Sequence, residues 1–191
     1  MPPKAKITKQ DIICTALELV RANGEDAINA RAIASALNCS TQPIFSNFTS
    51  MEELQDAVNS SAYEVYLDYI KKEVESGKYP QYKAFGMAYI RFAEEENELF
   101  KLLFMCDRRG MELKPSSDFE QSVEMIMKAN GMTKEKAELI HLEMWTCVHG
   151  IATMLATSYI SFDRELISRM LSDVYQGLRT RHSQEAENER N

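Results

Sequence analysis

Apolar residues return every three or four positions through almost the whole chain of 191 residues, and this spacing constrains the fold more than any other feature. A period near 3.6 places apolar side chains on one face of an α-helix, whereas a half-buried strand alternates at every second position. No segment shows that alternation. The chain is therefore expected to be all-α, and its hydrophobic content of 45% is sufficient for a packed core.

Capping residues divide this pattern into nine expected helices. Thr8 with Asp11 begins the first helix, and Gly24 ends it, since glycine readily adopts a left-handed terminal conformation. The polar segment 182–191 lacks apolar periodicity and is expected to be a disordered tail. The expected helices cover residues 8–23, 29–37 (capped by Asn29), 40–48 (capped by Ser40), 50–76, two abutting helices within 82–105, 117–130, 133–159 and 163–181.

The charge is unevenly distributed along a chain whose net charge is -7. Residues 1–50 carry five basic and four acidic side chains, whereas the remaining 141 residues carry 17 basic and 25 acidic ones. A near-neutral head (1–50) on an acidic body (51–181) is consistent with DNA binding confined to one end. The four cysteines show no metal-ligand spacing, and no signal peptide or membrane span is evident. We expect a cytoplasmic protein without metal or cofactor.

The stretch NARAIASALNCSTQPIFSNF, residues 29–48, has the pattern of a helix-turn-helix. Ala34 is small enough to let two helix backbones approach, and Asn38 tolerates the positive φ that a tight turn requires. The apolar residues of the two helix faces are Ile33, Ala34 and Leu37, followed by Ile44 and Phe48. In such a motif the second helix lies in the major groove of DNA, with its first residues at the base edges.

Thr41, Gln42 and Pro43 stand at the start of that second helix. Gln42 suits bidentate pairing with adenine, Thr41 suits a base or a phosphate, and the Pro43 ring suits a thymine methyl. Arg31 is the best single candidate for a guanine or phosphate contact. The alternative is two ordinary helices of a bundle, with Thr41 and Gln42 merely solvated. The candidate DNA-binding residues are Lys6, Arg31, Ser40, Thr41, Gln42, Pro43, Phe45 and Asn47.

The run ICTALELVRANGEDAINARAIASALNCSTQPIFSNFTSMEELQDAV resembles the head of the TetR family of regulators. The resemblance implies a nine-helix fold, namely a three-helix helix-turn-helix head on a helical ligand-binding and dimerisation body. It also implies a homodimer on a palindromic operator, and usually repression relieved by a small ligand. Phe45 replaces a common tyrosine phosphate donor, Asn47 a common histidine and Met51 a common lysine. We therefore expect the head to bind DNA phosphates weakly unless Lys4, Lys6 and Lys9 compensate for the missing donors.

The body offers an aromatic set that suits either a ligand pocket or plain core. Trp145 and His149 are four residues apart, so both project from one helix face, and Gly150 follows them. This Trp and His-Gly pattern resembles a TetR subgroup that carries it on the penultimate helix. The candidate ligand-binding residues are Tyr89, Phe92, Phe104, Met105, Trp145 and His149, for an unknown, largely apolar small molecule. Residues 134–181 are the expected homodimer surface.

Two other classes of protein compete with a DNA-binding regulator. An enzyme is disfavoured because the chain has no phosphate-binding glycine loop, no GxSxG and no HExxH. The run Glu94–Glu96 is more typical of a solvated helix end than of a carboxylate site. A helical interaction protein with a degenerate, non-binding head remains open, because the usual tyrosine and lysine of the head are missing.

Overall fold

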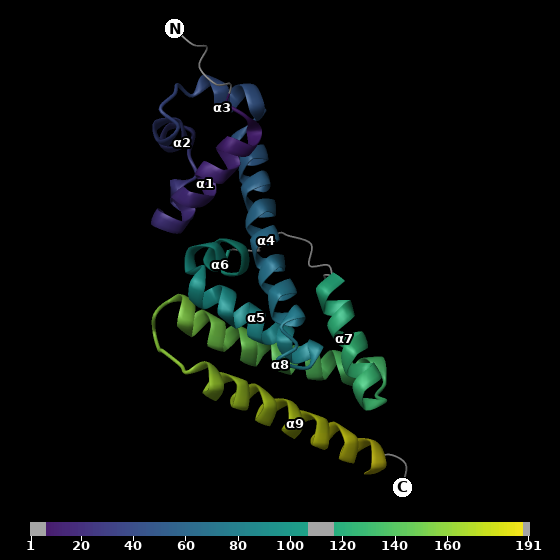
Figure 1. Ribbon diagram of the computed structural model, residues 1–191. Helices are drawn as coiled ribbons and strands as arrows, with labels where there is room; N and C mark the ends of the chain where they lie inside the picture. The colour runs from purple at the N-terminus through teal and green to yellow at the C-terminus, as the bar shows by residue number, and fades with distance from the viewer. Residues whose placement is uncertain (1–6, 107–116, 189–191) are drawn as a thin grey trace. The chain divides into compact units, whose positions relative to one another are not determined.

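The computed structural model describes residues 7–106 and 117–188, and no strand occurs among them. Nine α-helices make up most of this described part, which confirms the predicted all-α fold (Figure 1). Their bounds are α1 Lys9–Asn23, α2 Ala30–Ala36, α3 Gln42–Asn47, α4 Met51–Glu75, α5 Gln81–Glu95, α6 Asn97–Phe104, α7 Ser117–Asn130, α8 Lys134–Ala156 and α9 Arg164–Asn188, with a short 3-10 turn at Glu25–Ala27.

The described residues form two compact units, and the long helix α4 belongs to both. The head unit contains residues 7–68 and 95–106, and the body unit contains residues 69–94 and 117–188. This division differs from the predicted domains 1–50 and 51–181, because α6 packs against α1 and joins the head unit. The sequence pattern identifies α6 as a helix but gives no sign of which helices it packs against.

Helix α1 is the centre of the head unit and packs against α2, α3 and α6. Its predicted capping box is present, since Asp11 N donates to Thr8 Oγ1 at 3.1 Å and Thr8 N donates to Asp11 Oδ2 at 2.8 Å. Ile12 and Val20 are fully buried on its inner face. Burial of each such aliphatic side chain contributes about 1.5–3 kcal/mol. Gly24 ends the helix with φ of 78°.

Helix α8 is the core helix of the body unit and packs against α7 and α9. Ile140 and Ala152 are fully buried, and Val148 lies against α5. A Cβ added at Gly86 of α5 would stand 3.3 Å from Val148 Cγ2, so glycine at this position allows the two helices to approach closely. Among the described residues α8 is also the one helix long and apolar enough to cross a membrane, with a mean hydropathy of 1.2. Of the apolar window in α8, 39% is buried within the structure.

Helix α9 is longer than its sequence pattern indicates. Helix continues to Asn188 and therefore covers residues 182–188, where a disordered tail is expected from the sequence. His182 is only 2% exposed, and its Nε2 lies 3.2 Å from Glu143 Oε2 on α8. Lys136 Nζ donates to the backbone oxygen of His182 at 3.4 Å. A polar residue thus anchors the end of α9, which apolar periodicity does not detect.

Candidate functional site

Helices α2 and α3 are joined by the tight turn that the sequence predicts. Asn38 has φ of 51°, and Cys39 N donates to Ala34 O at 2.9 Å across the turn. Asn29 caps α2 by accepting a hydrogen bond from Ala32 N at 2.8 Å. Ile33 is fully buried and Ala34 is 4% exposed, so this face of α2 belongs to the core of the head unit. The helix-turn-helix is therefore present, with α3 as its second helix.

The predicted cap of α3 is wrong by one residue. Thr41 occupies the N-cap position, with φ of -72° and ψ of -12°, and its side chain makes no capping hydrogen bond. Ser40 lies before it, exposed. Pro43 stands in the first turn of α3, where the missing N–H of proline costs nothing because no partner exists there.

The exposed side chains of α3 are Gln42, Phe45 and Ser46, while Pro43 and Asn47 are half-buried. Asn47 Nδ2 donates to Pro43 O at 2.8 Å and lies 3.5 Å from Ile7 O. The Asn47 amide hydrogens are thus engaged within the head unit. Of the predicted DNA-binding set, Ser40, Gln42 and Phe45 share the exposed surface around α3, and Lys6 lies outside the described residues.

Most cations of the head unit are already paired with carboxylates. Lys9 Nζ lies 2.9 Å from Glu53 Oε1 and 4.6 Å from the centre of the Phe48 ring. The backbone N–H of Thr49 and the Lys9 ammonium lower the pKa of Glu53 to about 2, so this carboxylate stays charged. Arg31 is exposed on α2, and no ion pair joins it to a carboxylate in the described part of the chain. Arg31 therefore remains available to an external anion.

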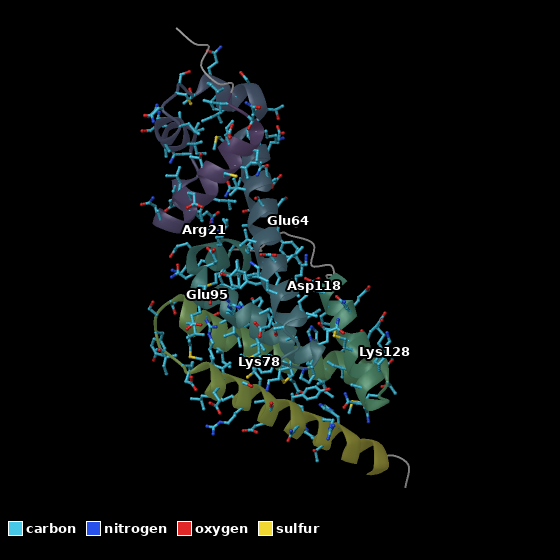
Figure 2. The ribbon with its side chains drawn as sticks, viewed as in Figure 1. Arg21, Glu64, Lys78, Glu95, Asp118 and Lys128 are labelled. Atoms are coloured by element: carbon cyan, nitrogen blue, oxygen red, sulfur yellow. The ribbon has the colours of Figure 1, made fainter. Side chains whose placement is uncertain are left out.

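Arg21 of α1, which is labelled in Figure 2, pairs with Glu96, the residue directly before α6 in the head unit. Its Nε lies 2.8 Å and its second terminal nitrogen 3.0 Å from the two carboxylate oxygens of Glu96, a bidentate arrangement. Glu18 Oε1 lies 2.6 Å from the remaining nitrogen. Hydrogen bonding to Glu96 raises the pKa of Arg21 above its usual value. Glu96, which the sequence suggests is solvated, is thus a structural partner of Arg21.

The body unit brings three of the six predicted ligand residues together. The Tyr89 hydroxyl lies 2.9 Å from His149 Nδ1, and the Trp145 ring stacks on the His149 ring at 5.0 Å with an interplanar angle of 9°. Trp145 is 48% exposed. Phe92 is fully buried, and Phe104 and Met105 belong to the head unit.

The Tyr89, Trp145 and His149 cluster does not line the cavity found in the body unit. This cavity of about 50 Å³ lies elsewhere, and drug-sized ligands occupy pockets of about 300–1,000 Å³. Its walls carry two carboxylates and three cations around an apolar floor. They are formed by Glu73, Lys78, Tyr79, Met87, Ile90, Arg91, Glu94, Arg164 and Ile167. None of the six predicted ligand residues lines it.

Comparison with known proteins identifies relatives that share this architecture. Residues 82–174 match the family described as "Tetracyclin repressor-like, C-terminal domain". A TetR-like transcriptional regulator from Rhodococcus sp. RHA1 has a similar structure, with a TM-score of 0.62 and 15% identity over 92% of this chain and 96% of that chain. The chain belongs to the TetR family of transcriptional regulators.

A second protein from Rhodococcus sp. RHA1, of unknown function, has a TM-score of 0.70 to this TetR-family chain. It is 18% identical over 92% of this chain and 97% of that chain. At such identities the likeness shows the fold alone. No curated protein sequence matches the chain.

Apolar side chains that this TetR-family chain leaves exposed in the body unit lie along α8, in the α8–α9 loop at Tyr159 and Ile160, and at the start of α9. Leu139 is 44%, Leu142 53% and Trp145 48% exposed on α8, and Leu166 on α9 is 36% exposed. Ile151, Ile167 and Leu171 also lie within the expected homodimer surface 134–181, yet all three are at most 3% exposed in the core of the chain. Sequence reasoning missed Leu139 and Leu142, although both fit an apolar row spaced three residues apart.

The TetR body unit also holds a half-buried polar cluster that the sequence gives no reason to expect. The Tyr82 hydroxyl lies 3.1 Å from His141 Nδ1, and Asn130 Nδ2 donates to the Tyr175 hydroxyl at 2.7 Å. The Tyr82 and Tyr175 rings are 5.6 Å apart, so the two pairs adjoin. Burial lowers the pKa of His141 from its usual 6.5 and raises that of Tyr82 well above 10.

The lowered pKa of His141 predicts a loss of stability in mild acid. Below pH 6.5 the unfolded chain binds a proton at His141 while the folded chain still excludes it. The free energy of unfolding should therefore be highest above pH 6.5 and fall as the pH drops, by at most about 1.4 kcal/mol per pH unit. Urea unfolding at pH 7.5 and 5.5 measures the slope. His141→Gln should reduce this slope, and an unchanged slope in that variant would contradict the assignment.

Proposed function

We propose that the chain is a repressor that binds a palindromic operator as a homodimer and is released when a small, largely apolar molecule binds its body. The observation that supports DNA binding most directly is the exposed surface of the helix-turn-helix. There, the Gln42 amide and the Arg31 guanidinium both face solvent without a carboxylate partner. An amide reads adenine and a guanidinium binds phosphate or guanine. A regulator of this kind would act on chromosomal DNA in the cytoplasm.

A homodimer is supported by the exposed apolar residues of α8 and α9. Leu142 and Trp145 are each about half exposed, and apolar side chains gathered in this way on a surface are typical of protein interfaces. A two-fold symmetric dimer carries two copies of α3, one for each half of a palindromic site. Successive major grooves lie about 34–36 Å apart, which sets the spacing that a palindromic operator requires.

The Tyr89, Trp145 and His149 cluster supports a ligand site in the body. Its stacked rings offer an apolar face, and the Tyr89–His149 hydrogen bond offers a polar tip. Because Tyr89 is only 6% exposed and is hydrogen-bonded to His149, a ligand that enters this cluster must displace some of its side chains. Ligand binding would then change the packing of α5 against α8, and this change would release the chain from the operator.

A salt titration of operator binding tests the DNA-binding proposal. The duplex is the DNA directly upstream of the gene that encodes this chain. Its affinity for the protein is measured by mobility shift between 50 and 200 mM salt. A protein with 6–10 phosphate contacts loses about 10³–10⁵ in affinity over that interval. Because Lys9 is paired with Glu53 and Phe45 carries no hydroxyl, this chain should lose markedly less.

The matched control for the salt titration is Met51→Lys, which restores a cation where the family commonly carries one. This variant should bind more tightly, with a log–log salt slope steeper by about 0.9 for each half-site. A steep slope of log affinity against log salt in the native chain, unchanged by Met51→Lys, would contradict the expected weak binding to DNA phosphates.

A helical interaction protein with a non-binding head is the second candidate, and the charge of the head unit favours it. The described residues of this unit carry four basic and twelve acidic side chains. Acidic surface repels DNA phosphates at low ionic strength most strongly. If no duplex shifts at 50 mM salt while the chain remains folded, this second candidate replaces the first.

A further inference from the structure

We infer that Phe45 contacts a thymine methyl group in the operator and, with Gln42, selects adjacent A·T pairs. This inference rests on the proposed function and names the kind of operator that it requires. The argument starts from Phe45, which is 53% exposed in the middle of α3. Phe48, three residues later, is 2% exposed in the core of the head unit. The two aromatic residues of this segment therefore have different environments, and about half of the Phe45 side chain is open to an outside partner.

The polar side chains around Phe45 are mostly satisfied within the helix. Ser46 Oγ donates to Gln42 O at 2.9 Å, and Asn47 Nδ2 donates to Pro43 O at 2.8 Å. The sequence of α3, QPIFSN, contains no charged residue. Gln42 is thus the exposed side chain of α3 whose amide donors and acceptor remain available for base recognition, and Phe45 is the exposed apolar one.

The spacing of these two residues puts them on one face of the helix. Residues three apart on an α-helix lie side by side, so Gln42 and Phe45 would face the same part of a groove. In the major groove the thymine methyl is the apolar group among the base edges, and glutamine pairs bidentately with adenine N6 and N7. Together they favour neighbouring A·T pairs, read by one hydrogen-bonded and one apolar contact.

The local charge indicates that DNA is the occupant of this surface. Residues 27–51 contain no carboxylate and one cation, Arg31, although the head unit as a whole is acidic. A segment without carboxylates that carries an exposed guanidinium is complementary to a polyanion. Phe45 has no hydrogen-bond donor or acceptor on its side chain, so its contact with DNA must be apolar.

Replacing thymidine by deoxyuridine in the duplex tests this contact directly, because the two nucleosides differ only by the methyl group of the base. The full-length native chain first selects duplexes from a random double-stranded pool. The selected duplex is then synthesised with one thymine at a time changed to deoxyuridine. One thymine in each half-site should show about fourfold weaker binding, the value of one buried methyl group. Changes at other positions should leave affinity within about twofold.

The variant Phe45→Ala should bind the thymine duplex more weakly and no longer distinguish thymine from deoxyuridine. Gln42→Ala is the matched control, since it should weaken binding while preserving the thymine-to-deoxyuridine ratio. Circular dichroism of each variant verifies the fold. If the native chain selects a duplex but tolerates every deoxyuridine, the inference about Phe45 is overturned while the proposed function stands. If the native chain enriches no duplex, both are overturned.

Discussion

A chain carrying Leu142→Asp is expected to be a monomer and to bind its operator about 10²–10⁴-fold more weakly than the native chain. Leu142 is 53% exposed on α8, so the substitution leaves the core of the body unit intact. In a dimer the introduced carboxylate would face its own symmetry mate and lose water, which costs several kcal/mol for an unpaired ion. Loss of the dimer removes the effective concentration of the second head on the operator.

Sedimentation measures the oligomeric state of Leu142→Asp, and mobility shift measures its affinity for the operator. Leu142→Met is the matched control, because it keeps an apolar side chain of similar volume and should dimerise as the native chain does. A folded Leu142→Asp chain that remains dimeric would place the interface away from α8. A monomer that binds the operator with native affinity would refute the role of the dimer in binding.

The helices of this chain are largely predictable because their signals are local. Thr8, Asn29 and Thr133 cap helices where the sequence indicates, since capping depends on residues within one turn. Asn38 adopts the positive φ expected of it. The exceptions are boundaries set by distant contacts. Helix α9 extends beyond its apolar pattern because His182 is buried beside Glu143, a residue 39 positions away in the sequence.

The DNA-binding surface is only partly predictable from the sequence. Residue type shows that Phe45 lacks a phosphate donor, and helical spacing puts it beside Gln42. The sequence does not show that Lys9 is held by Glu53, because that ion pair spans 44 residues. The expected compensation by Lys9 is therefore weakened by a tertiary contact.

The ligand site is the least predictable part, because aromatic residues at helical spacing serve equally well as core or as pocket lining. Tyr89 and His149 are joined by a hydrogen bond between α5 and α8, and no periodicity encodes that pairing. Phe92 packs on Tyr69 with ring centroids 5.4 Å apart and is fully buried. The same sequence pattern thus includes a core residue, Phe92, and three residues that remain candidates for ligand contact, namely Tyr89, Trp145 and His149.

Arg31→Ala and Gln42→Ala should both weaken operator binding, but in different ways. Arg31 is exposed near the start of α2, and the first helix of a helix-turn-helix crosses the DNA backbone. Its loss should cost about 1.5–3 kcal/mol per half-site, a factor of roughly 10–150, equally for all duplexes. Gln42→Ala should cost about 1–3 kcal/mol per half-site only when an adenine faces the residue.

Competition between the selected operator and duplexes changed at single A·T pairs separates these two effects. For Arg31→Ala the ranking of duplexes should stay the same, and the salt slope should become shallower by about 0.9 per half-site. For Gln42→Ala the salt slope should stay the same, and the affinity should no longer depend on the identity of one A·T pair. Arg31→Lys, which keeps the charge, should recover most of the affinity if the partner is a phosphate. If Arg31→Lys instead loses preference at one G·C pair, Arg31 reads a guanine through its bidentate geometry.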